Sequence, residues 1–424
     1  MNVLLVSSNR DESYMRTWPL GLACVAAATT RAGHRVSVLD LVNLEDPLFA
    51  LKKGIDRFRP DVVAFSVRNI DDQNMEEPRF FLHEVKGIVT YCKNLTRAPV
   101  VLGGPGYSMY PVSSLEYLGA DMGIQGEGET AFPALLDRME RGSELTGVPG
   151  LYLPGLGLVG ERRFEQDLDQ LPLPGTDVFK DSIEMNEEFW FPVQTRRGCP
   201  MRCSYCSTAS IEGCLFRKRS PRRVVQWLAE WVKIGCRRIC FVDNTFNVPP
   251  SYAKALCSEL IAADLGITWR CILYPVRIDE ELARSMGAAG CEEASVGFES
   301  GSELILHGMR KRFNPDDVRE TCNLLKTHGI RCMGFLLLGG PGETRETCLK
   351  SLTFADSLDL DTMKLTVGIR IYPDTELAGI AIAEGIIDPS DDLLLPRFYI
   401  APDLKEWLPR TVKEWAATRP NWMI

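Results

Sequence analysis

The stretch Thr195-Arg-Arg-Gly-Cys-Pro-Met-Arg-Cys-Ser-Tyr-Cys-Ser207 holds three cysteines, Cys199, Cys203 and Cys206, in a CxxxCxxC spacing. Iron–sulfur clusters are held by cysteine thiolates, and four thiolates normally close a [4Fe–4S] cluster. Three thiolates can hold three irons and leave the fourth iron open to a ligand, as a catalytic zinc site keeps one position open. The spacing therefore predicts a [4Fe–4S] cluster on these three residues.

The alternative interpretation is that the three thiols are ordinary buried cysteines, because the chain has 14 cysteines. Buried cysteines usually lie within periodic apolar runs. These three lie instead in a polar loop with Arg196, Arg197 and Arg202. Positive charge favours thiolates, so we expect these arginines to support an anionic cluster.

The spacing, with the aromatic Tyr205 before the last cysteine, resembles the cluster loop of the radical S-adenosylmethionine enzymes. The resemblance implies that the amino and carboxylate groups of S-adenosylmethionine chelate the open iron. It implies that one electron from the cluster cleaves the sulfonium and yields a 5′-deoxyadenosyl radical. An external one-electron donor, such as a flavodoxin or a ferredoxin, is then expected as a partner.

Length and composition are those of a globular protein with room for two hydrophobic cores. The chain has 424 residues, of which 45% are hydrophobic and 25% charged, as in ordinary globular proteins. A formal net charge of −9 argues against a nucleic-acid partner. No apolar run is long enough to span a membrane, and Met1–Ser8 resembles a strand more than a signal peptide. We therefore expect a cytoplasmic protein.

Residues 1–142 alternate short apolar strands with helical segments, which predicts a Rossmann-like, doubly wound parallel sheet. The expected elements are strands Val3–Ser7, Val36–Asp40, Asp61–Val67, Pro99–Leu102 and Met122–Gln125, with a helix at Pro19–Ala32. Ligands on such sheets bind beyond the carboxyl ends of the strands. The loops at those ends are Ser7–Trp18, Arg68–Asn74, Gly103–Tyr107 and Gly126–Thr130.

This region resembles the cobalamin-binding domain that precedes the radical domain in one large class of radical S-adenosylmethionine enzymes. The matching stretches are Trp18-Pro-Leu-Gly-Leu, Ala32-Gly-His-Arg-Val, Val101-Leu-Gly-Gly-Pro and Gly126-Glu-Gly-Glu-Thr130. The resemblance implies a cobalamin site, and its expected contacts are Gly103, Gly104, Gly106, Gly126 and Glu127. The alternative is a Rossmann-like domain that has lost its ligand.

The DxHxxG signature, which supplies a histidine to cobalt, is absent. The four histidines are His34, His83, His307 and His328, and none falls in a strand-end loop of residues 1–142. We expect no histidine on the lower face of the cobalt.

Residues 143–190 are rich in proline and predict an irregular linker, with a hairpin at Leu151–Glu161. Residues 191–378 return to strand–helix alternation, which predicts a full or partial barrel with its site at the strand carboxyl ends. The expected elements are strands Phe191–Thr195, Arg238–Val242, Thr268–Ile272, Glu293–Phe298, Arg331–Leu338 and Thr362–Ile371, and helices Pro221–Ile234 (capped by Ser220), Ser251–Leu265, Glu280–Ala289 and Pro315–His328. The resemblance specifies a partial (β/α)6 barrel, and residues 379–424 form a carboxy-terminal extension.

Polar stretches of the barrel match S-adenosylmethionine-binding positions of the family. Asp243 and Asn244 lie where the family places a group that binds the methionyl amine. Glu299 and Ser300 match the strand end that contacts the ribose, whose hydroxyls a carboxylate can accept. Lys311 or Arg312 could pair with the methionyl carboxylate, and Gly334–Glu343 resembles the strand beside the adenine. Each of these stretches also has a purely structural interpretation. The acid would be a capping residue, the two cations part of a solvated basic run, and Gly334–Glu343 a turn of the barrel.

The two resemblances together imply a cobalamin-dependent radical S-adenosylmethionine enzyme. The main prediction is C-methylation of an unactivated carbon in a small-molecule or lipid-like substrate. One alternative is radical cyclisation, ring contraction or rearrangement with the same cofactors, and another is a cobalamin or redox sensor without turnover. No cysteine follows Cys348, so no auxiliary cluster is expected.

Overall fold

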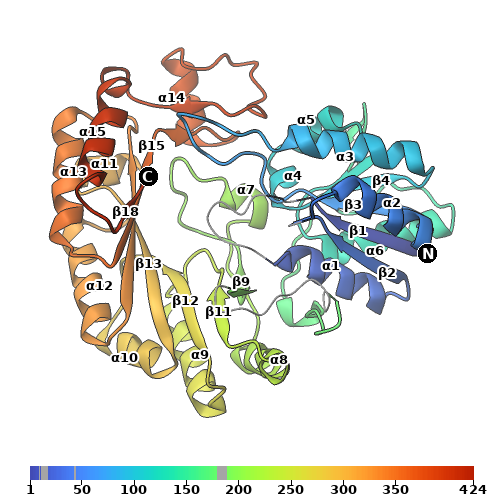
Figure 1. Cartoon of the computed structure of the whole chain (residues 1–424), viewed down its shortest axis with the longest axis horizontal. Helices are drawn as coiled ribbons and strands as arrows, with labels where there is room; N and C mark the ends of the chain where they lie inside the picture. Colours follow the sequence, from blue (N-terminus) through green and yellow to red (C-terminus); the bar gives the residue numbers. More distant parts are fainter. Residues whose placement is uncertain (9, 11–17, 43, 179–188) are drawn as a thin grey trace. The chain divides into compact units, whose positions relative to one another are not determined.

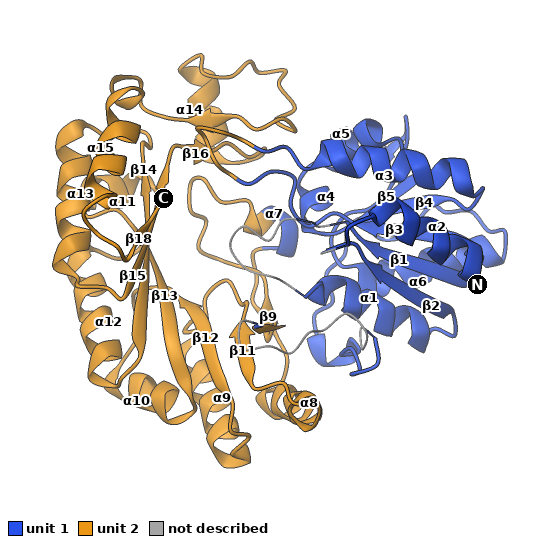
Figure 2. Cartoon of the chain, in the orientation of Figure 1, with its two compact units in different colours: residues 1–72, 79–189, 210–213 blue, residues 73–78, 190–209, 214–424 orange. Residues whose placement is uncertain are grey.

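The computed structural model describes residues 1–8, 10, 18–42, 44–178 and 189–424, and its chain divides into two compact units (Figure 2). Unit 1 comprises Met1–Asp72, Arg79–Phe189 and Ser210–Gly213. Unit 2 comprises Gln73–Pro78, Trp190–Ala209 and Cys214–Ile424. The segment expected as a linker, residues 143–190, lies in unit 1 as far as it is described, except for Trp190, which begins unit 2.

Unit 1 is built on a seven-stranded sheet of order β2-β1-β3-β4-β5-β6-β7. Its strands are β1 (Asn2–Ser7), β2 (Arg35–Asp40), β3 (Val62–Ser66), β4 (Val100–Gly103), β5 (Met122–Ile124), β6 (Leu151–Leu153) and β7 (Gly157–Leu158). The first five run parallel, and β6 and β7 form an antiparallel hairpin at the edge. The five expected strands and the expected hairpin are confirmed. The chain order reverses between β1 and β3, which is where a doubly wound sheet binds its ligand.

The helices of unit 1 cover both faces of its sheet (Figure 1). They are α1 (Leu20–Arg31), α2 (Pro47–Phe58), α3 (Leu82–Leu95), α4 (Pro105–Met109), α5 (Pro111–Leu118), α6 (Gly128–Glu140) and the 3₁₀ helix η1 (Leu168–Gln170). α1 packs with α6, and α2 packs with α3. Because both faces are covered, β1 is apolar throughout Val3–Val6, and each of these side chains is at most 1% exposed.

Unit 2 is built on a seven-stranded parallel sheet of order β18-β15-β14-β13-β12-β11-β8. Its strands are β8 (Phe191–Val193), β11 (Arg238–Phe241), β12 (Thr268–Leu273), β13 (Cys291–Glu299), β14 (Arg331–Leu338), β15 (Thr362–Val367) and β18 (Trp422–Met423). The first six are the expected strands of the partial barrel. The seventh, β18, comes from the carboxy-terminal extension and was not predicted.

Short strands and helices complete unit 2. The strand pairs are β9 (Arg196–Arg197) with β10 (Arg217–Lys218), and β16 (Ile369–Arg370) with β17 (Phe398–Tyr399). The helices are α7 (Thr208–Glu212, shared with unit 1), α8 (Pro221–Lys233), α9 (Pro250–Ala263), α10 (Glu280–Ala288), α11 (Glu303–Gly308), α12 (Pro315–Thr327), α13 (Arg345–Ser357), α14 (Glu376–Ala383), the 3₁₀ helix η2 (Pro402–Leu404) and α15 (Trp407–Ala416). Ser220 is the N-cap residue of α8 and Pro221 its first residue, as expected, although the Ser220 side chain makes no capping hydrogen bond. The last predicted strand was wrong in its extent, because it breaks at Gly368, where φ is 76°.

Helices pack along one face of the unit 2 sheet (Figure 1), and we call the opposite face the inner face. Strand β14 shows the difference, because Leu336 and Leu338 are buried under the helices while Met333, Phe335 and Leu337 are only half-buried. This alternation is the two-residue period of a strand. Figure 1 places α9, α10, α12 and α13 along the outer face.

The carboxy-terminal tryptophans hold β18 in place. Arg419 donates to both carboxylate oxygens of Asp356 in α13, at 2.6 Å each. The same guanidinium lies 4.5 Å from the ring centre of Trp415 and 5.4 Å from that of Trp422. Trp422 pairs with Met363 of β15. The extension therefore packs and extends the sheet.

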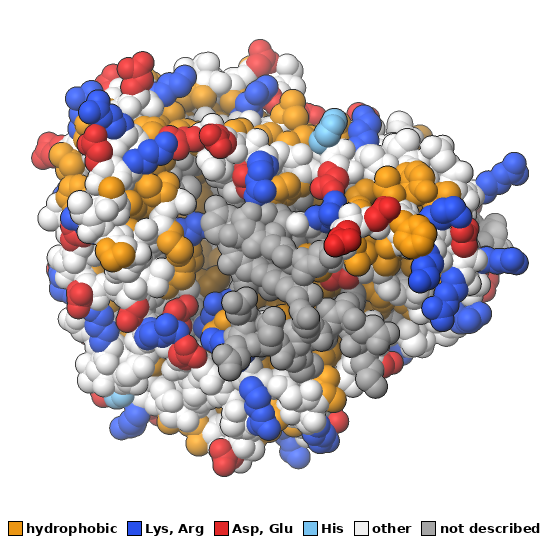
Figure 3. Space-filling view, viewed as in Figure 1, with side chains coloured by type: hydrophobic (Ala, Val, Ile, Leu, Met, Phe, Trp, Pro, Cys, Tyr) orange, Lys and Arg blue, Asp and Glu red, His pale blue; other side chains and the backbone are white. Residues whose placement is uncertain are grey.

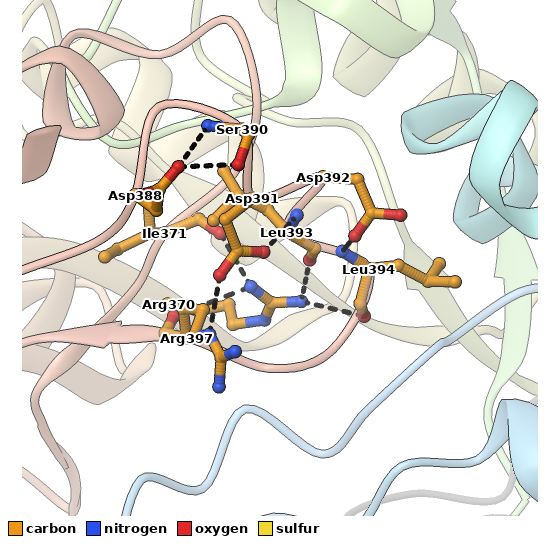
Figure 4. A network of polar contacts seen from close by, with 9 residues as sticks. All are labelled: Arg370, Ile371, Asp388, Ser390, Asp391, Asp392, Leu393, Leu394 and Arg397. Carbon is orange, nitrogen blue, oxygen red and sulfur yellow. Dashed lines mark hydrogen bonds and ion pairs between the residues drawn. The ribbon is translucent and has the colours of Figure 1, made fainter.

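The loop of residues 388–397 is wound around one buried cation, Arg370 (Figure 4). Its guanidinium donates to the carbonyl oxygens of Ile371 at 2.7 Å and Leu393 at 2.9 Å. Asp391 accepts from the Leu393 N–H and from Nε of Arg397, at 2.9 and 2.8 Å. Carbonyl oxygens of the loop thus compensate the buried charge of Arg370, as a buried charge requires.

Within the described part of the chain, no helix combines the length and the hydropathy that a bilayer span requires. Figure 3 shows basic and acidic side chains interspersed over the visible face, with hydrophobic side chains between them.

The glycine-rich turn after β4 is shaped by the chain's own backbone. Gly104 has a φ of 96°, and a Cβ on it would lie 2.5 Å from the Val67 carbonyl oxygen. Gly106 donates its N–H to the same oxygen at 3.0 Å. A Cβ on Gly106 would lie 2.8 Å from the Arg68 carbonyl oxygen. The ends of β3 and β4 therefore require these two glycines whether or not a ligand binds.

Gly104→Ala is expected to lower the stability of unit 1 by roughly 1–3 kcal/mol, because alanine tolerates neither the left-handed φ nor the contact with Val67. The matched control is Gly87→Ala in α3, where a Cβ meets no atom within 4 Å and alanine favours the helix by about 1 kcal/mol. Thermal melting measures both variants. Equal melting temperatures for the two would contradict this account of the turn.

A buried carboxylate holds the turn after β14. Glu343 is 5% exposed and accepts the N–H groups of Gly339 and Gly340. The Cys348 thiol also donates to it, at 3.7 Å. Burial outweighs these bonds and raises the pKa of Glu343 to about 7.

A raised pKa means that the folded state holds a proton that the unfolded chain has already lost, so stability falls as the pH rises from about 4.5 through 7. Glu343→Gln should remove this dependence, which amounts to roughly 1–3 kcal/mol. The measurement is the difference in melting temperature between wild type and variant at pH 5, 6, 7 and 8. The exposed Glu346→Gln serves as control, and a constant difference between wild type and Glu343→Gln would rule out the titration.

Candidate functional site

The cluster loop, Cys199–Cys206, begins at a strand end fixed by Asp243. Asp243 follows β11, and its carboxylate accepts the N–H of Thr195 at 2.7 Å and the N–H of Arg196 at 3.0 Å. The Thr195 hydroxyl donates to the second carboxylate oxygen at 2.5 Å. These bonds tie the strand before the cysteines to its neighbour in the sheet.

Arg196 completes this network. Its Nε lies 3.3 Å from Asp243, and its two terminal nitrogens donate to the carbonyl oxygens of Phe246 and Val248 at 2.7 and 2.8 Å. The Arg196 and Asp243 side chains are 1% and 0% exposed. Carboxylate and carbonyl oxygens thus surround the charge of Arg196, which ties it to this network, and its expected support of an anionic cluster stays a prediction. Arg197 likewise donates to Gln194, at 3.0 Å.

The same geometry bears on the predicted amine contact. The carboxylate oxygens of Asp243 are occupied by Thr195 and Arg196, and the side chain has no exposed surface. We therefore assign Asp243 to positioning the cluster loop. The prediction of a methionyl amine contact is carried forward for Asn244 alone.

The middle of the cluster loop is anchored through the backbone of Ser204. Its N–H donates to the Met309 carbonyl oxygen, after α11, at 3.2 Å. Its carbonyl oxygen accepts the Leu377 N–H, in the first turn of α14, at 2.9 Å. The segment between Cys203 and Cys206 is thus fixed by main-chain atoms from two other elements.

Beside the loop, Tyr205, Glu299 and Lys311 form a compact polar cluster. The Tyr205 hydroxyl and the Lys311 ammonium both donate to Oε1 of Glu299, at 3.0 and 3.1 Å. The Lys311 and Glu299 side chains are 5% and 14% exposed. Although burial opposes its charge, Glu299, Tyr205 and Cys203 hold the pKa of Lys311 well above its ordinary value. Glu299 and Lys311 follow Tyr205 in the sequence by 94 and 106 positions, and the fold brings both of them beside the second cysteine of the loop, Cys203.

The remaining predicted barrel residues lie elsewhere. Ser300 is fully buried, and its hydroxyl lies 3.0 Å from that of Ser351 in α13. Arg312 is exposed, and its N–H donates to the Tyr274 hydroxyl at 2.8 Å. Of the two predicted cations, Lys311 is therefore the one that the structure brings to Glu299. Ser300 shapes the turn, and its predicted ribose contact stays a prediction.

The donor set fits a cluster with three protein ligands. Cys206 is exposed and Cys199 and Cys203 are half-buried, whereas structural thiols such as Cys257 and Cys271 are at most 2% exposed. Burial raises the pKa of the Cys203 thiol, and the neighbouring Lys311 opposes that shift. Across the described ranges, no group of three or more His, Cys, Asp or Glu side chains is arranged to hold a metal ion. The three cysteines are thus more accessible than the structural thiols, and Cys206 lies near enough to Cys203 to affect its pKa.

In unit 1 the strand ends at the switch point carry small residues. The Ser8 hydroxyl donates to the Ser66 carbonyl oxygen at 2.9 Å, joining the ends of β1 and β3. At the end of β4, a Cβ on Gly103 would meet only the Ile124 carbonyl oxygen, at 4.0 Å. A side chain at Gly103 would therefore meet open space, whereas a side chain at Gly104 or Gly106 would meet the backbone of Val67 and Arg68. A floor of small side chains fits a large flat ligand, and most of the predicted loop Ser7–Trp18 lies outside the described residues.

The Gly126–Thr130 stretch is held by polar contacts that the sequence did not indicate. Gly126 has a φ of 98°, and its N–H donates to the Ser108 hydroxyl at 3.0 Å. Glu127 is buried and accepts the Glu165 N–H at 2.7 Å. Arg162 also belongs to this region, and it donates to the Ile211 carbonyl oxygen at 2.8 Å. A direct cofactor contact by Glu127 stays a prediction.

The four histidines lie in different parts of the fold, and the expectation of no histidine on the lower face of the cobalt stays a prediction. His34 immediately precedes β2 and lies 3.2 Å from the amino terminus, so it sits at the opposite end of the strands from the ligand edge. His83 lies in α3, His307 in α11, and His328 beside Glu280 at 2.7 Å.

Comparison with known proteins agrees with both halves of this description. Residues 8–136 match the B12 binding domain family, and residues 193–355 match the radical SAM superfamily. An uncharacterized methyltransferase from Pyrococcus horikoshii is 29% identical over 400 residues, which is 91% of this chain and 84% of the relative.

Two solved structures of one enzyme share the whole fold. The radical S-adenosylmethionine methyltransferase TsrM from Kitasatospora setae, solved with its tryptophan substrate and a S-adenosylmethionine analogue, superposes with a TM-score of 0.88 at 25% identity. The match covers 100% of this chain and 90% of TsrM. Its structure with cobalamin and a [4Fe–4S] cluster gives 0.87 at 23% identity, with the same coverage.

The two family matches cover the two regions in which the cluster loop and the strand-end glycines were found. Enzymes with this pair of domains use a [4Fe–4S] cluster, S-adenosylmethionine and cobalamin. The chain belongs to the cobalamin-binding radical S-adenosylmethionine enzymes, the superfamily of the class B-type methyltransferases.

Proposed function

We propose that this enzyme transfers a methyl group to a carbon atom of a small molecule. The observation that carries the proposal is the polar cluster of Tyr205, Glu299 and Lys311 beside the three-cysteine loop, in a chain that also has a B12 binding domain. A three-cysteine loop leaves one iron for a ligand, and this cluster offers a carboxylate and an ammonium next to it. The methyltransferase relatives support the same reaction class.

Each group of the site has a separate task. Cys199, Cys203 and Cys206 would hold the cluster, which supplies electrons to bound S-adenosylmethionine while cobalamin carries the methyl group. Glu299 accepts hydroxyl hydrogen bonds, which suits a ribose. Lys311 holds Glu299 in place, because its buried ammonium donates to the Glu299 carboxylate at 3.1 Å. Asp243 and Arg196 hold the start of the loop and do not touch the cofactor.

Two further parts of the proposal concern the surroundings of the enzyme. A three-cysteine cluster needs an external one-electron donor, for which a flavodoxin or ferredoxin is the expected class. All 14 cysteines are described and are thiols. A chain with this many thiols suits the cytoplasm, where thiols stay reduced.

Counting the products of S-adenosylmethionine tests the reaction class. The reconstituted enzyme, supplied with reductant and substrate, should form one S-adenosylhomocysteine for each methyl group transferred. Radical methylation should add one 5′-deoxyadenosine for each methylated product. The triple variant Cys199→Ala, Cys203→Ala, Cys206→Ala should lose the cluster and form no 5′-deoxyadenosine. Abundant 5′-deoxyadenosine with almost no S-adenosylhomocysteine would refute methyl transfer and indicate rearrangement or cyclisation.

Glu299→Gln should weaken S-adenosylmethionine binding by about 10- to 100-fold, because an amide loses the charge-assisted bonds. Iron content should be unchanged, since Glu299 is not a cluster ligand. Equilibrium dialysis with labelled S-adenosylmethionine gives the affinity, and Glu303→Gln on the exposed side of α11 is the matched control. If both variants bind like the wild type, Glu299 has no part in the cofactor site.

A further inference from the structure

A buried tyrosine that was not among the predicted site residues, Tyr274, lies beside the polar cluster. Tyr274 directly follows β12 and is 6% exposed. Its hydroxyl accepts the N–H of Arg312 at 2.8 Å, and Arg312 follows Lys311 in the chain. Cys203 and Lys311 both lie near enough to this hydroxyl to affect its pKa. The Tyr274 hydroxyl therefore belongs to the region in which Lys311 meets the second cysteine of the cluster loop.

Contacts with the backbone and with the ring both fix the position of Tyr274. The side-chain oxygen of Asn247 accepts the Tyr274 N–H at 2.9 Å, and its side-chain nitrogen donates to the Tyr274 carbonyl oxygen at 2.7 Å. Asn247 itself is fully buried. The Tyr274 ring packs edge-on against Phe313, with the ring centres 5.1 Å apart. A side chain locked in this way holds its polar group ready for a ligand.

The Tyr274 hydroxyl serves only as a hydrogen-bond acceptor within the described part of the chain. A phenolic hydroxyl can accept a hydrogen bond and can also donate one. The N–H of Arg312 uses the acceptor, and no described residue accepts the phenolic hydrogen. Burial raises the pKa of Tyr274, so the hydroxyl keeps that hydrogen. A buried donor without an acceptor costs about 1–3 kcal/mol, which an acceptor on a bound ligand would recover.

The neighbouring ammonium of Lys311 is already engaged by groups of the protein. It donates to Oε1 of Glu299 at 3.1 Å. The Tyr205 hydroxyl and the Cys203 thiol also interact with it. Lys311 therefore supplies positive charge to this region, while a directional bond to a ligand requires another donor. Tyr274 is such a donor, and a carboxylate is the acceptor that gains from both the charge and the hydrogen bond.

We propose that Tyr274 binds S-adenosylmethionine by donating its phenolic hydrogen to the methionyl carboxylate. Glu299 and Tyr274 then contact opposite ends of the cofactor, because an acceptor suits the ribose hydroxyls and a donor suits the carboxylate. Chelation of an open iron uses one carboxylate oxygen, so the second oxygen is free to accept. The assignment rests on the proposed function, which places S-adenosylmethionine beside Glu299. Tyr274 positions the cofactor, and no transferred group passes through it.

Equilibrium dialysis of the full-length, cluster-reconstituted enzyme with two labelled ligands tests the proposal. The ligands are S-adenosylmethionine and decarboxylated S-adenosylmethionine, which keeps the amine and the ribose but lacks the carboxylate. Tyr274→Phe should bind S-adenosylmethionine about 10-fold more weakly than the wild type, because a hydrogen bond to a charged group is lost. It should bind the decarboxylated analogue as the wild type does. Tyr399→Phe is the matched control, because the hydroxyl that it removes donates to Glu384 within the protein, at 2.7 Å.

An unchanged affinity of Tyr274→Phe for S-adenosylmethionine would overturn the proposal, and so would an equal loss of affinity for both ligands. The electron paramagnetic resonance signal of the reduced cluster, recorded without S-adenosylmethionine, should be the same in the wild type and in Tyr274→Phe. A changed signal would assign the hydrogen bond to a sulfur of the cluster and would also overturn the proposal. If the analogue binds too weakly to measure, the affinity for S-adenosylmethionine and this signal decide together.

Melting temperature and iron content of Tyr274→Phe are measured alongside. If this variant does not fold, Tyr274→Met takes its place with the same expectations, because it also removes the hydroxyl. Failure of the proposed function shows separately. Glu299→Gln in the same dialysis reports on the S-adenosylmethionine site, and product counting with the wild type reports on methyl transfer, so neither result depends on Tyr274.

Discussion

The cofactor half of the molecule depends on one buried ion pair, Asp243 with Arg196. Removing one partner of such a pair typically costs about 3–5 kcal/mol, because the other charge is left without compensation. Here the pair also carries the register between β8 and β11 and the direction in which the chain leaves the sheet. The three cysteines follow within ten residues of Arg196. A fault in this pair would therefore move all three ligands together.

Most of the fold could be predicted from the sequence, because apolar strands alternate with helices at nearly every step. Strands such as β1 and β3 are continuous apolar runs, and their burial on both faces leaves no other assignment. The strand β18 could not be predicted, because two residues carry no period. Its place depends on the contact of Arg419 with Asp356, which is 63 residues away in the chain.

The candidate site was predictable where the residues lie close together in sequence, and less so where they meet through folding. The CxxxCxxC spacing is local and specific. Asp243 can accept hydrogen bonds from Thr195 and Arg196 only because their strands pair in the fold. The sequence does not show this pairing, so it suggested a cofactor contact for a carboxylate that holds the start of the cluster loop. Gly104 and Gly106 are a second example, because the backbone of Val67 and Arg68 requires them independently of any ligand. A glycine needed by neighbouring backbone and a glycine needed by a ligand look alike in a sequence.

The anchoring of Ser204 by backbone atoms has a consequence for sequence variation. An anchor made of an N–H and a carbonyl oxygen is indifferent to the side chain, so any residue except proline preserves it. It is sensitive instead to the number of residues between the second and third cysteines, since one insertion would move the N–H and the oxygen away from Met309 and Leu377. Homologous chains are therefore free to change the identity of this residue but not the length of the loop. The spacing of the motif is thus a requirement of the surrounding helices as well as of the iron.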